Sequence, residues 1–230
     1  MDKRITIVCG HYGSGKTEFS VNYAIKLARE GKRTALADLD IANPYFRSRE
    51  RQQFLEENGV ALYSNVYHAD ISADMPAITA EIRGPLEDGG CHVVVDSGGD
   101  DTGARVLNQF RKYFLGPEAG LYCVVNANRP ETADFEGALA HIRSICGETG
   151  IPLAGLISNT HMLRETRAED VIKGYGLCRE LSSFLEIPVE YCCASREICD
   201  KISTLKNIKE DKEFRLFPME LYMRPAWLDR

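Results

Sequence analysis

Short runs of apolar, often β-branched residues alternate along the chain with longer segments whose apolar residues recur at helical spacing. The short runs predict strands at 5–9, 34–39, 93–96, 121–125, 153–158 and 189–193. The longer segments predict helices at 16–30, 75–86, 104–114, 132–148 and 168–185. Strands that alternate with helices of crossover length are typical of an α/β fold, in which helices cover both faces of a mostly parallel sheet.

Two stretches lack such a pattern. Residues 41–75 are irregular, although a helix fits around 49–58. The residues from 214 to 230 contain prolines that argue against one continuous helix. The chain of 230 residues has no internal repeat and no linker, so we expect a single domain over 1–230.

The first predicted strand and helix are joined by a glycine-rich turn with the pattern Gly-x4-Gly-Lys-Thr of a phosphate-binding loop. Glycines let the backbone N–H groups wrap phosphate, and the start of the following helix adds positive potential. Lys16 is predicted to reach the β- and γ-phosphates of a nucleoside triphosphate, and the Thr17 hydroxyl to bind magnesium. The predicted nucleotide contacts in this segment are Gly10, His11, Tyr12, Gly13, Ser14, Gly15, Lys16, Thr17 and Glu18.

Acidic residues follow two other predicted strands. In Asp96-Ser97-Gly98-Gly99, Asp96 is expected to hold magnesium through water, and the Gly99 N–H to approach a γ-phosphate. Asp38 and Asp40 lie at alternate positions of a strand end, so their side chains point the same way. We expect Asp38 to help hold the metal and Asp40 to orient an attacking water; the alternative is a turn or helix-cap role.

The segment Ser158-Asn159-Thr160-His161 also follows a predicted strand, and the Asn159 amide is expected to pair with a purine edge. The guanine-specific pattern Asn-Lys-x-Asp has a carboxylate three residues after the asparagine. This chain has Met162 at that position, so the segment favours adenine.

Composition narrows the classes of partner. The net charge is −6 and the pI is about 5.5, which argues against a broad nucleic-acid interface. Apolar runs are far shorter than the roughly 20 residues that span a bilayer, and the N-terminal strand meets Gly10 too soon for a signal peptide. We therefore expect a cytoplasmic protein without membrane or nucleic-acid partners. The eight cysteines form no Cys-x-x-Cys pair and are expected to be free thiols.

Together these motifs resemble the CobQ/CobB/MinD/ParA group of P-loop ATPases, and the resemblance covers most of the chain in element order. It implies a three-layer P-loop NTPase fold with seven or eight strands. It also implies ATP and magnesium bound in a homodimer, and slow hydrolysis controlled by a protein partner. The family's roles carry over to Lys16, Thr17, Asp38, Asp40, Asp96, Gly99 and Asn159.

One position departs from the MinD/ParA pattern. That pattern has a signature lysine five residues before the motif lysine, and this lysine reaches the partner subunit's phosphates. Here the position is His11, whose imidazole is shorter and largely neutral at pH 7. His11 either donates a hydrogen bond or fills the loop, and both roles remain open.

Three functions follow as hypotheses. The first is a slow, magnesium-dependent ATPase that acts as a nucleotide switch on another protein. The second is a biosynthetic enzyme of the dethiobiotin-synthetase-like branch, which also lacks the signature lysine and would use Arg47 or Arg129 for a small acid. The third is a sensor that binds nucleotide and rarely turns it over. Without such a ligand, we expect Arg129 to brace its loop.

Overall fold

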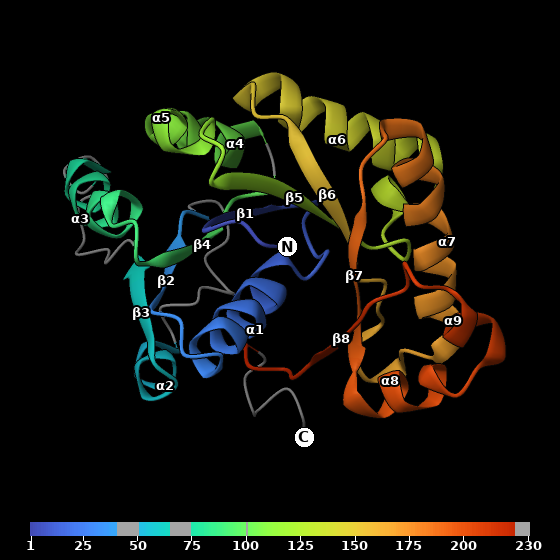
Figure 1. Ribbon diagram of the computed structural model, residues 1–230. Coiled ribbons are helices and arrows are strands. Elements are labelled where there is room, and N and C mark those ends of the chain that lie inside the picture. The colour runs from blue at the N-terminus through green and yellow to red at the C-terminus, as the bar shows by residue number, and fades with distance from the viewer. Residues whose placement is uncertain (41–50, 65–74, 100, 224–230) are drawn as a thin grey trace.

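The computed structural model describes residues 1–40, 51–64, 75–99 and 101–223 (Figure 1). Over these residues one eight-stranded, all-parallel sheet has the order β3-β2-β4-β1-β5-β6-β7-β8. The strands are β1 (Ile5–Cys9), β2 (Thr34–Asp38), β3 (Val60–Ser64), β4 (His92–Asp96), β5 (Ala119–Val125), β6 (Leu153–Ser158), β7 (Val189–Ser195) and β8 (Leu216–Met219). This sheet confirms the predicted α/β fold.

Helices lie on both faces of the sheet, which gives the three layers (Figure 1). They are α1 (Lys16–Arg29), α2 (Gln52–Glu57), α3 (Met75–Glu87), α4 (Asp101–Leu107), α5 (Arg111–Phe114), α6 (Phe135–Thr149), α7 (Ala168–Leu185), α8 (Arg196–Ser203) and α9 (Lys206–Glu210). In the described part of the chain, no helix is both long and apolar enough to span a bilayer.

Alternation along the central strands divides the core into two main clusters. Ile5, Ile7 and Cys9 of β1 face one side, where they pack with residues of α3, α4, α6 and α7. Val8 faces the other side, towards Phe19 and neighbouring residues of α1. The central strands are buried on both faces, which explains why they read as short, continuous apolar runs. The carboxyl ends of all strands meet at one edge of this sheet.

Two edge strands were not predicted: β3 lies in the stretch 41–75, and β8 lies after residue 214. The helix expected around 49–58 is confirmed by α2. Helix α3 ends at Glu87, so the helix predicted over 75–86 is confirmed, and it continues through Gly84 and Pro85. The helix predicted at 104–114 is two short helices separated by a 3-10 turn at Asn108–Phe110.

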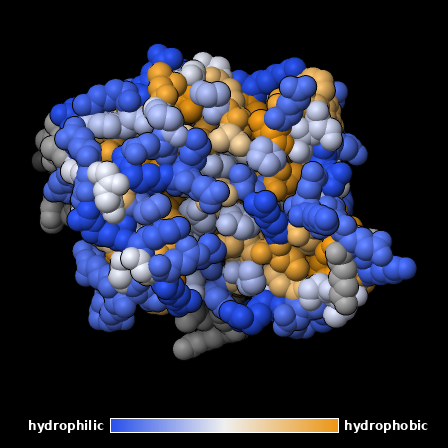
Figure 2. Space-filling model, viewed as in Figure 1, coloured by the Kyte–Doolittle hydropathy of each residue, from blue (hydrophilic) through white to orange (hydrophobic). Residues whose placement is uncertain are grey.

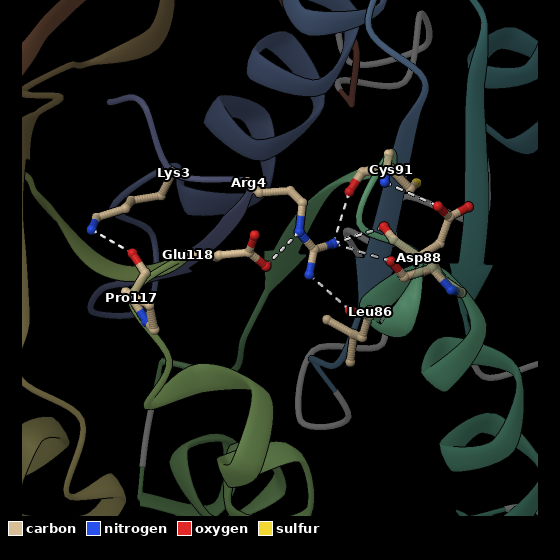
Figure 3. Close-up of polar contacts among 9 residues, drawn as sticks. Lys3, Arg4, Leu86, Asp88, Cys91, Pro117 and Glu118 are labelled. Atoms are coloured by element: carbon tan, nitrogen blue, oxygen red, sulfur yellow. Dashed lines mark hydrogen bonds and ion pairs between the residues drawn. The ribbon is translucent and has the colours of Figure 1, made fainter.

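At the amino ends of the strands, Arg4 directly precedes β1 and connects several neighbouring segments (Figure 3). Its guanidinium donates to the backbone oxygens of Leu86 (2.8 Å), Asp88 (3.0 Å) and Cys91 (3.0 Å). Its Nε donates to Glu118 at 2.9 Å. Carbonyls at a helix C-terminus lack partners within the helix, so Arg4 satisfies the end of α3 while tying it to the start of β5.

Candidate nucleotide-binding site

The glycine-rich loop joins β1 to α1 at the carboxyl edge of the sheet, and its backbone conformation requires glycine. Gly13 and Gly15 have φ angles of 72° and 84°, in the left-handed region. A Cβ at Gly15 would lie 2.4 Å from Nδ2 of Asn159, so even the space beside the loop excludes a side chain. The loop is therefore shaped by close contacts from neighbouring strand ends.

Two side chains from those strand ends hold the loop through its carbonyl groups. Nε of Arg129, after β5, donates to the backbone oxygen of Gly13 at 2.9 Å. Nδ2 of Asn159, after β6, donates to the backbone oxygen of Ser14 at 2.8 Å. These bonds fix the loop before any ligand arrives, and the bond from Arg129 agrees with the expected bracing role.

The motif lysine lies beside an acid that follows β2. Nζ of Lys16 is 3.1 Å from Oδ2 of Asp40, and both side chains are buried. The backbone N–H of Asp40 donates to Oδ1 of Asp38 at 3.2 Å. Asp38 pairs in register with Asp96 of the neighbouring strand β4. The structure thus brings the three predicted acids to the first turn of α1, although they come from separate parts of the sequence.

Asp96 is the most deeply buried of these acids, and one of its carboxylate oxygens has no hydrogen-bond donor. Ser20 donates to its Oδ1 at 3.1 Å, whereas its Oδ2 is buried without a hydrogen bond. Burial raises the pKa of Asp96 to about 7; Lys16 opposes this shift, and the nearby Asp38 and Asp40 add to it. A divalent cation would offset both the burial and the mutual repulsion, so the donor set fits magnesium.

The side chains do not form a complete metal cage. Among the described residues, no group of three or more His, Cys, Asp or Glu is arranged to hold a metal ion. Magnesium commonly keeps several waters and takes only one or two carboxylates plus phosphate oxygens. The buried Asp96 and the adjacent Thr17 therefore match a metal that arrives with a phosphorylated ligand.

Gly99 closes the loop from the β4 side. A Cβ at Gly99 would lie 2.5 Å from the backbone oxygen of Gly10 and 3.0 Å from the backbone nitrogen of Tyr12. Any larger residue would push the segment after β4 away from the phosphate-binding loop. Gly99 thus lies directly against the loop, and its contact with a γ-phosphate stays a prediction.

A cavity of about 400 Å³ opens beside the loop, on the side away from Asp40 and Asp96. Its apolar lining residues include Leu163, Ala194, Ile198, Met219, Leu221 and Met223. The other lining residues include Gly13, Gly15, Lys16, Thr17, Glu18, Arg129, Asn159 and His161. Figure 2 shows hydrophobic residues gathered at the surface near α8 and β8, where this cavity lies. A flat apolar ring system with a polar tail would match such walls.

The chain beyond β8 forms one wall of this cavity. Oδ1 of Asn22 accepts from the backbone N–H of Glu220 at 2.9 Å. The carboxylate of Glu18 accepts from the backbone N–H groups of Tyr222 and Met223. Burial raises the pKa of Glu18 to about 7, partly offset by these two N–H groups. Glu18, predicted to contact nucleotide, thus directs its carboxylate to the chain's own backbone.

His11 faces away from the cavity. Its Nδ1 lies 3.8 Å from a carboxylate oxygen of Glu131, and its ring meets the His141 ring edge-on at 5.3 Å between centroids. His11 is not among the residues that line the cavity. His161, for which the sequence motifs predict no role, does line it; the only signal in the sequence is its position two residues after Asn159.

Comparison with known proteins agrees with this geometry. The CobQ/CobB/MinD/ParA nucleotide-binding domain matches residues 5–210. The chain belongs to this family. It is therefore a P-loop nucleotide-binding domain, as its motifs indicated. Comparison with curated protein sequences gives no significant match.

Solved structures with a similar fold include the protein FtsY from three bacteria. FtsY from Mycoplasma mycoides has a TM-score of 0.56 at 18% identity, covering 81% of this chain and 58% of that chain. FtsY from Thermotoga maritima has a TM-score of 0.54 at 20% identity, covering 81% of this chain and 60% of that chain. FtsY from Elizabethkingia anophelis in complex with GDP has a TM-score of 0.56 at 18% identity, covering 85% of this chain and 58% of that chain. The chain spans less than two thirds of these proteins, and the likeness concerns the fold alone.

Proposed function

We propose that this protein binds ATP with magnesium, hydrolyses it slowly and acts as a nucleotide switch on a partner protein. The observation that carries the proposal is the cluster of Lys16, Asp40 and Asp96 around the phosphate-binding loop. This cluster offers a cation for phosphate and a buried acid for a metal, and Lys16 also lines the apolar cavity beside the loop. A nucleoside triphosphate with magnesium matches this arrangement, because its charged phosphates lie at one end and its aromatic base at the other.

Within this proposal, Thr17 and Asp96 would hold magnesium, with Asp38 behind them. Bound magnesium supplies electrostatic stabilisation of the charge that develops during phosphoryl transfer. Lys16 exchanges the Asp40 carboxylate for phosphate oxygens, because phosphate brings the larger negative charge. The Asp40 carboxylate, no longer paired with Lys16, would accept a hydrogen bond from the attacking water.

The preference for adenine is supported by the hydrogen bond that Asn159 already makes. Its Nδ2 is engaged by the Ser14 carbonyl, which leaves Oδ1 as an acceptor. Adenine offers an amino group at this edge, whereas guanine offers a carbonyl oxygen. The acid that lines the cavity, Glu18, is engaged by the backbone of Tyr222 and Met223. Guanine would therefore lack a carboxylate for its N–H groups.

Titration calorimetry with magnesium and either ATP or GTP tests the proposal. We expect ATP to bind at least tenfold more tightly, and Lys16→Ala to abolish tight binding because it removes the motif cation. Phosphate release should be slow, roughly 10⁻⁴ to 10⁻² per second, the range of switch NTPases without an activator. Equal or tighter binding of GTP would refute the adenine assignment.

The alternative, a biosynthetic enzyme, is favoured by one observation: His11 stands where the switch proteins have their signature lysine. Of the two arginines considered for its substrate, Arg47 lies outside the described residues and Arg129 is bonded to Gly13. A homodimer is proposed for either function. Fast ATP consumption that requires one added small acid would replace the switch with the enzyme.

A further inference from the structure

Arg129 places a positive charge in the cavity wall. Its Nε is bonded to the Gly13 carbonyl, and its guanidinium packs so closely on Gly13 that a Cβ there would lie 2.8 Å from Cζ. In the described part of the chain, Arg129 forms no ion pair with a carboxylate. A guanidinium fixed against the loop in this way retains donors for an oxygen-rich ligand.

His161 presents a second donor at the same place. Its Nδ1 accepts from the backbone N–H of Leu163 at 3.4 Å, so the proton of the neutral ring is on Nε2. That Nε2 is buried and has no hydrogen-bond partner. Burial and the charge of Arg129 lower the pKa of His161 to about 4, which keeps the ring neutral at pH 7. A buried N–H group without an acceptor is unfavourable, so an acceptor atom of a ligand would stabilise it.

The position of these two donors indicates which part of a ligand they meet. Both line the cavity beside Gly13 and Gly15, whereas Asp40 and Asp96 lie at the other end of the loop and do not line it. The apolar walls that suit a base lie beyond them. The donors therefore stand between the place for the base and the place for the terminal phosphates.

We propose that Arg129 and His161 contact the ribose or α-phosphate oxygens of the bound nucleotide. The inference deepens the proposed nucleotide binding and rests on it. The pair supplies, from the same subunit, a cation and a neutral donor close to the phosphate-binding loop. His11 instead faces Glu131 and His141. The two donors follow strands β5 and β6 in the sequence.

Affinities for ATP and ADP, measured by calorimetry with magnesium, test the assignment. Arg129→Gln and His161→Phe should each weaken both nucleotides by about tenfold or more, the range for hydrogen bonds to charged groups. His161→Gln, which keeps an N–H donor, should stay within about threefold of the wild type. Arg143→Gln, an exposed arginine of α6, is the matched control and should change neither affinity. A loss confined to ATP would move the pair to the terminal phosphate and overturn the proposal.

A spectroscopic readout separates a contact from a structural role. In ¹⁵N-labelled histidine spectra at pH 7, the signal lost in His161→Gln should show a proton on Nε2. ADP should shift that proton's resonance and slow its exchange. A wild-type protein that binds neither nucleotide would refute the proposed function itself. Tight binding with an unchanged His161 signal, or full affinity in His161→Phe, would refute only the role of this pair.

Discussion

Nζ of Lys16 lies 3.1 Å from Oδ2 of Asp40, and the two side chains are only 5% and 3% exposed. The motif lysine is thus neutralised by an acid of the same chain before phosphate arrives. Removing one partner of a buried ion pair leaves the other charge uncompensated, which destabilises a fold by about 3–5 kcal/mol. Nucleotide binding and Asp40 therefore compete for the same cation.

Asp40→Ala should lower the melting temperature of the nucleotide-free protein, because Lys16 then stays buried without its carboxylate partner. ATP with magnesium should restore more stability in the variant than in the wild type, since phosphate replaces the missing charge. Turnover should fall strongly while ATP affinity stays within a few-fold. Thermal denaturation and phosphate release measure these effects.

The control for this variant is Asp88→Ala, which removes an exposed ion pair with Arg33. Exposed pairs contribute about 0–1 kcal/mol, so its melting temperature and turnover should change little. If Asp40→Ala hydrolyses ATP at the wild-type rate, Asp40 does not orient the water.

Asp96→Asn should separate stability from function. The native pKa of about 7 lies above the ordinary value of 3.8, so between these values the native state holds a proton that the unfolded state releases. Wild-type stability consequently falls as pH rises from about 4 to about 7, by at most about 4 kcal/mol. The variant lacks this titration, so its melting temperature relative to wild type should increase from pH 5 to pH 8.

The same variant should lose magnesium-dependent ATP affinity, because the amide cannot supply the negative charge for the cation. Calorimetry with and without magnesium would reveal this loss. Retained magnesium dependence would remove Asp96 from the metal site, whatever its effect on stability.

Gly174 and Gly176 form a matched pair on α7. A Cβ at Gly174 would lie 2.0 Å from Oγ1 of Thr160, whereas nothing lies within 4 Å of a Cβ at Gly176. Gly174→Ala should lower the free energy of unfolding by roughly 1–3 kcal/mol or more. It should also weaken ATP binding, because Thr160 directly follows Asn159 in the sequence. Gly176→Ala should leave the free energy of unfolding unchanged or raise it by up to about 1 kcal/mol. Denaturant titration compares them, and equal effects would contradict this close helix–sheet contact.

His11→Lys tests assembly. The wild type should shift only modestly towards dimer with a non-hydrolysable ATP analogue, because His11 offers no extended cation. The lysine variant should dimerise more strongly, since its longer side chain can reach a partner's phosphates. Light scattering measures both. Tyr12→Lys adds the same charge at a neighbouring, 61% exposed position and should not reproduce the effect. Strong ATP-driven dimerisation of the wild type would show that another group bridges the subunits.

The sequence predicted the central strands and the loop because they carry local signals: buried apolar runs, and glycines at set spacing. The edge strands lack such signals. In β3 only Val60 is buried, and β8 contains Pro218, so pairing with a neighbour defines both strands. The proton position of His161 depends on the backbone of Leu163, a contact that residue identity does not encode.

Glu18 illustrates the same limit over a longer distance. Its place after Thr17 predicted a nucleotide contact, but its carboxylate meets backbone groups more than 200 residues later in the sequence. The same fold puts Arg129 and Asn159 on the loop from two separate strand ends. Strand-end position was predictable, whereas the particular carbonyl that each side chain contacts was not.

The wall that α1 shares with residues 220–223 also sets an order of events during synthesis. Glu18 and Asn22 emerge from the ribosome about 200 residues before the backbone groups that they bind. Domains generally fold as units during synthesis. A nascent chain that does not yet contain residues 220–223 therefore lacks one wall of the cavity, and it cannot enclose a nucleotide until those residues have emerged.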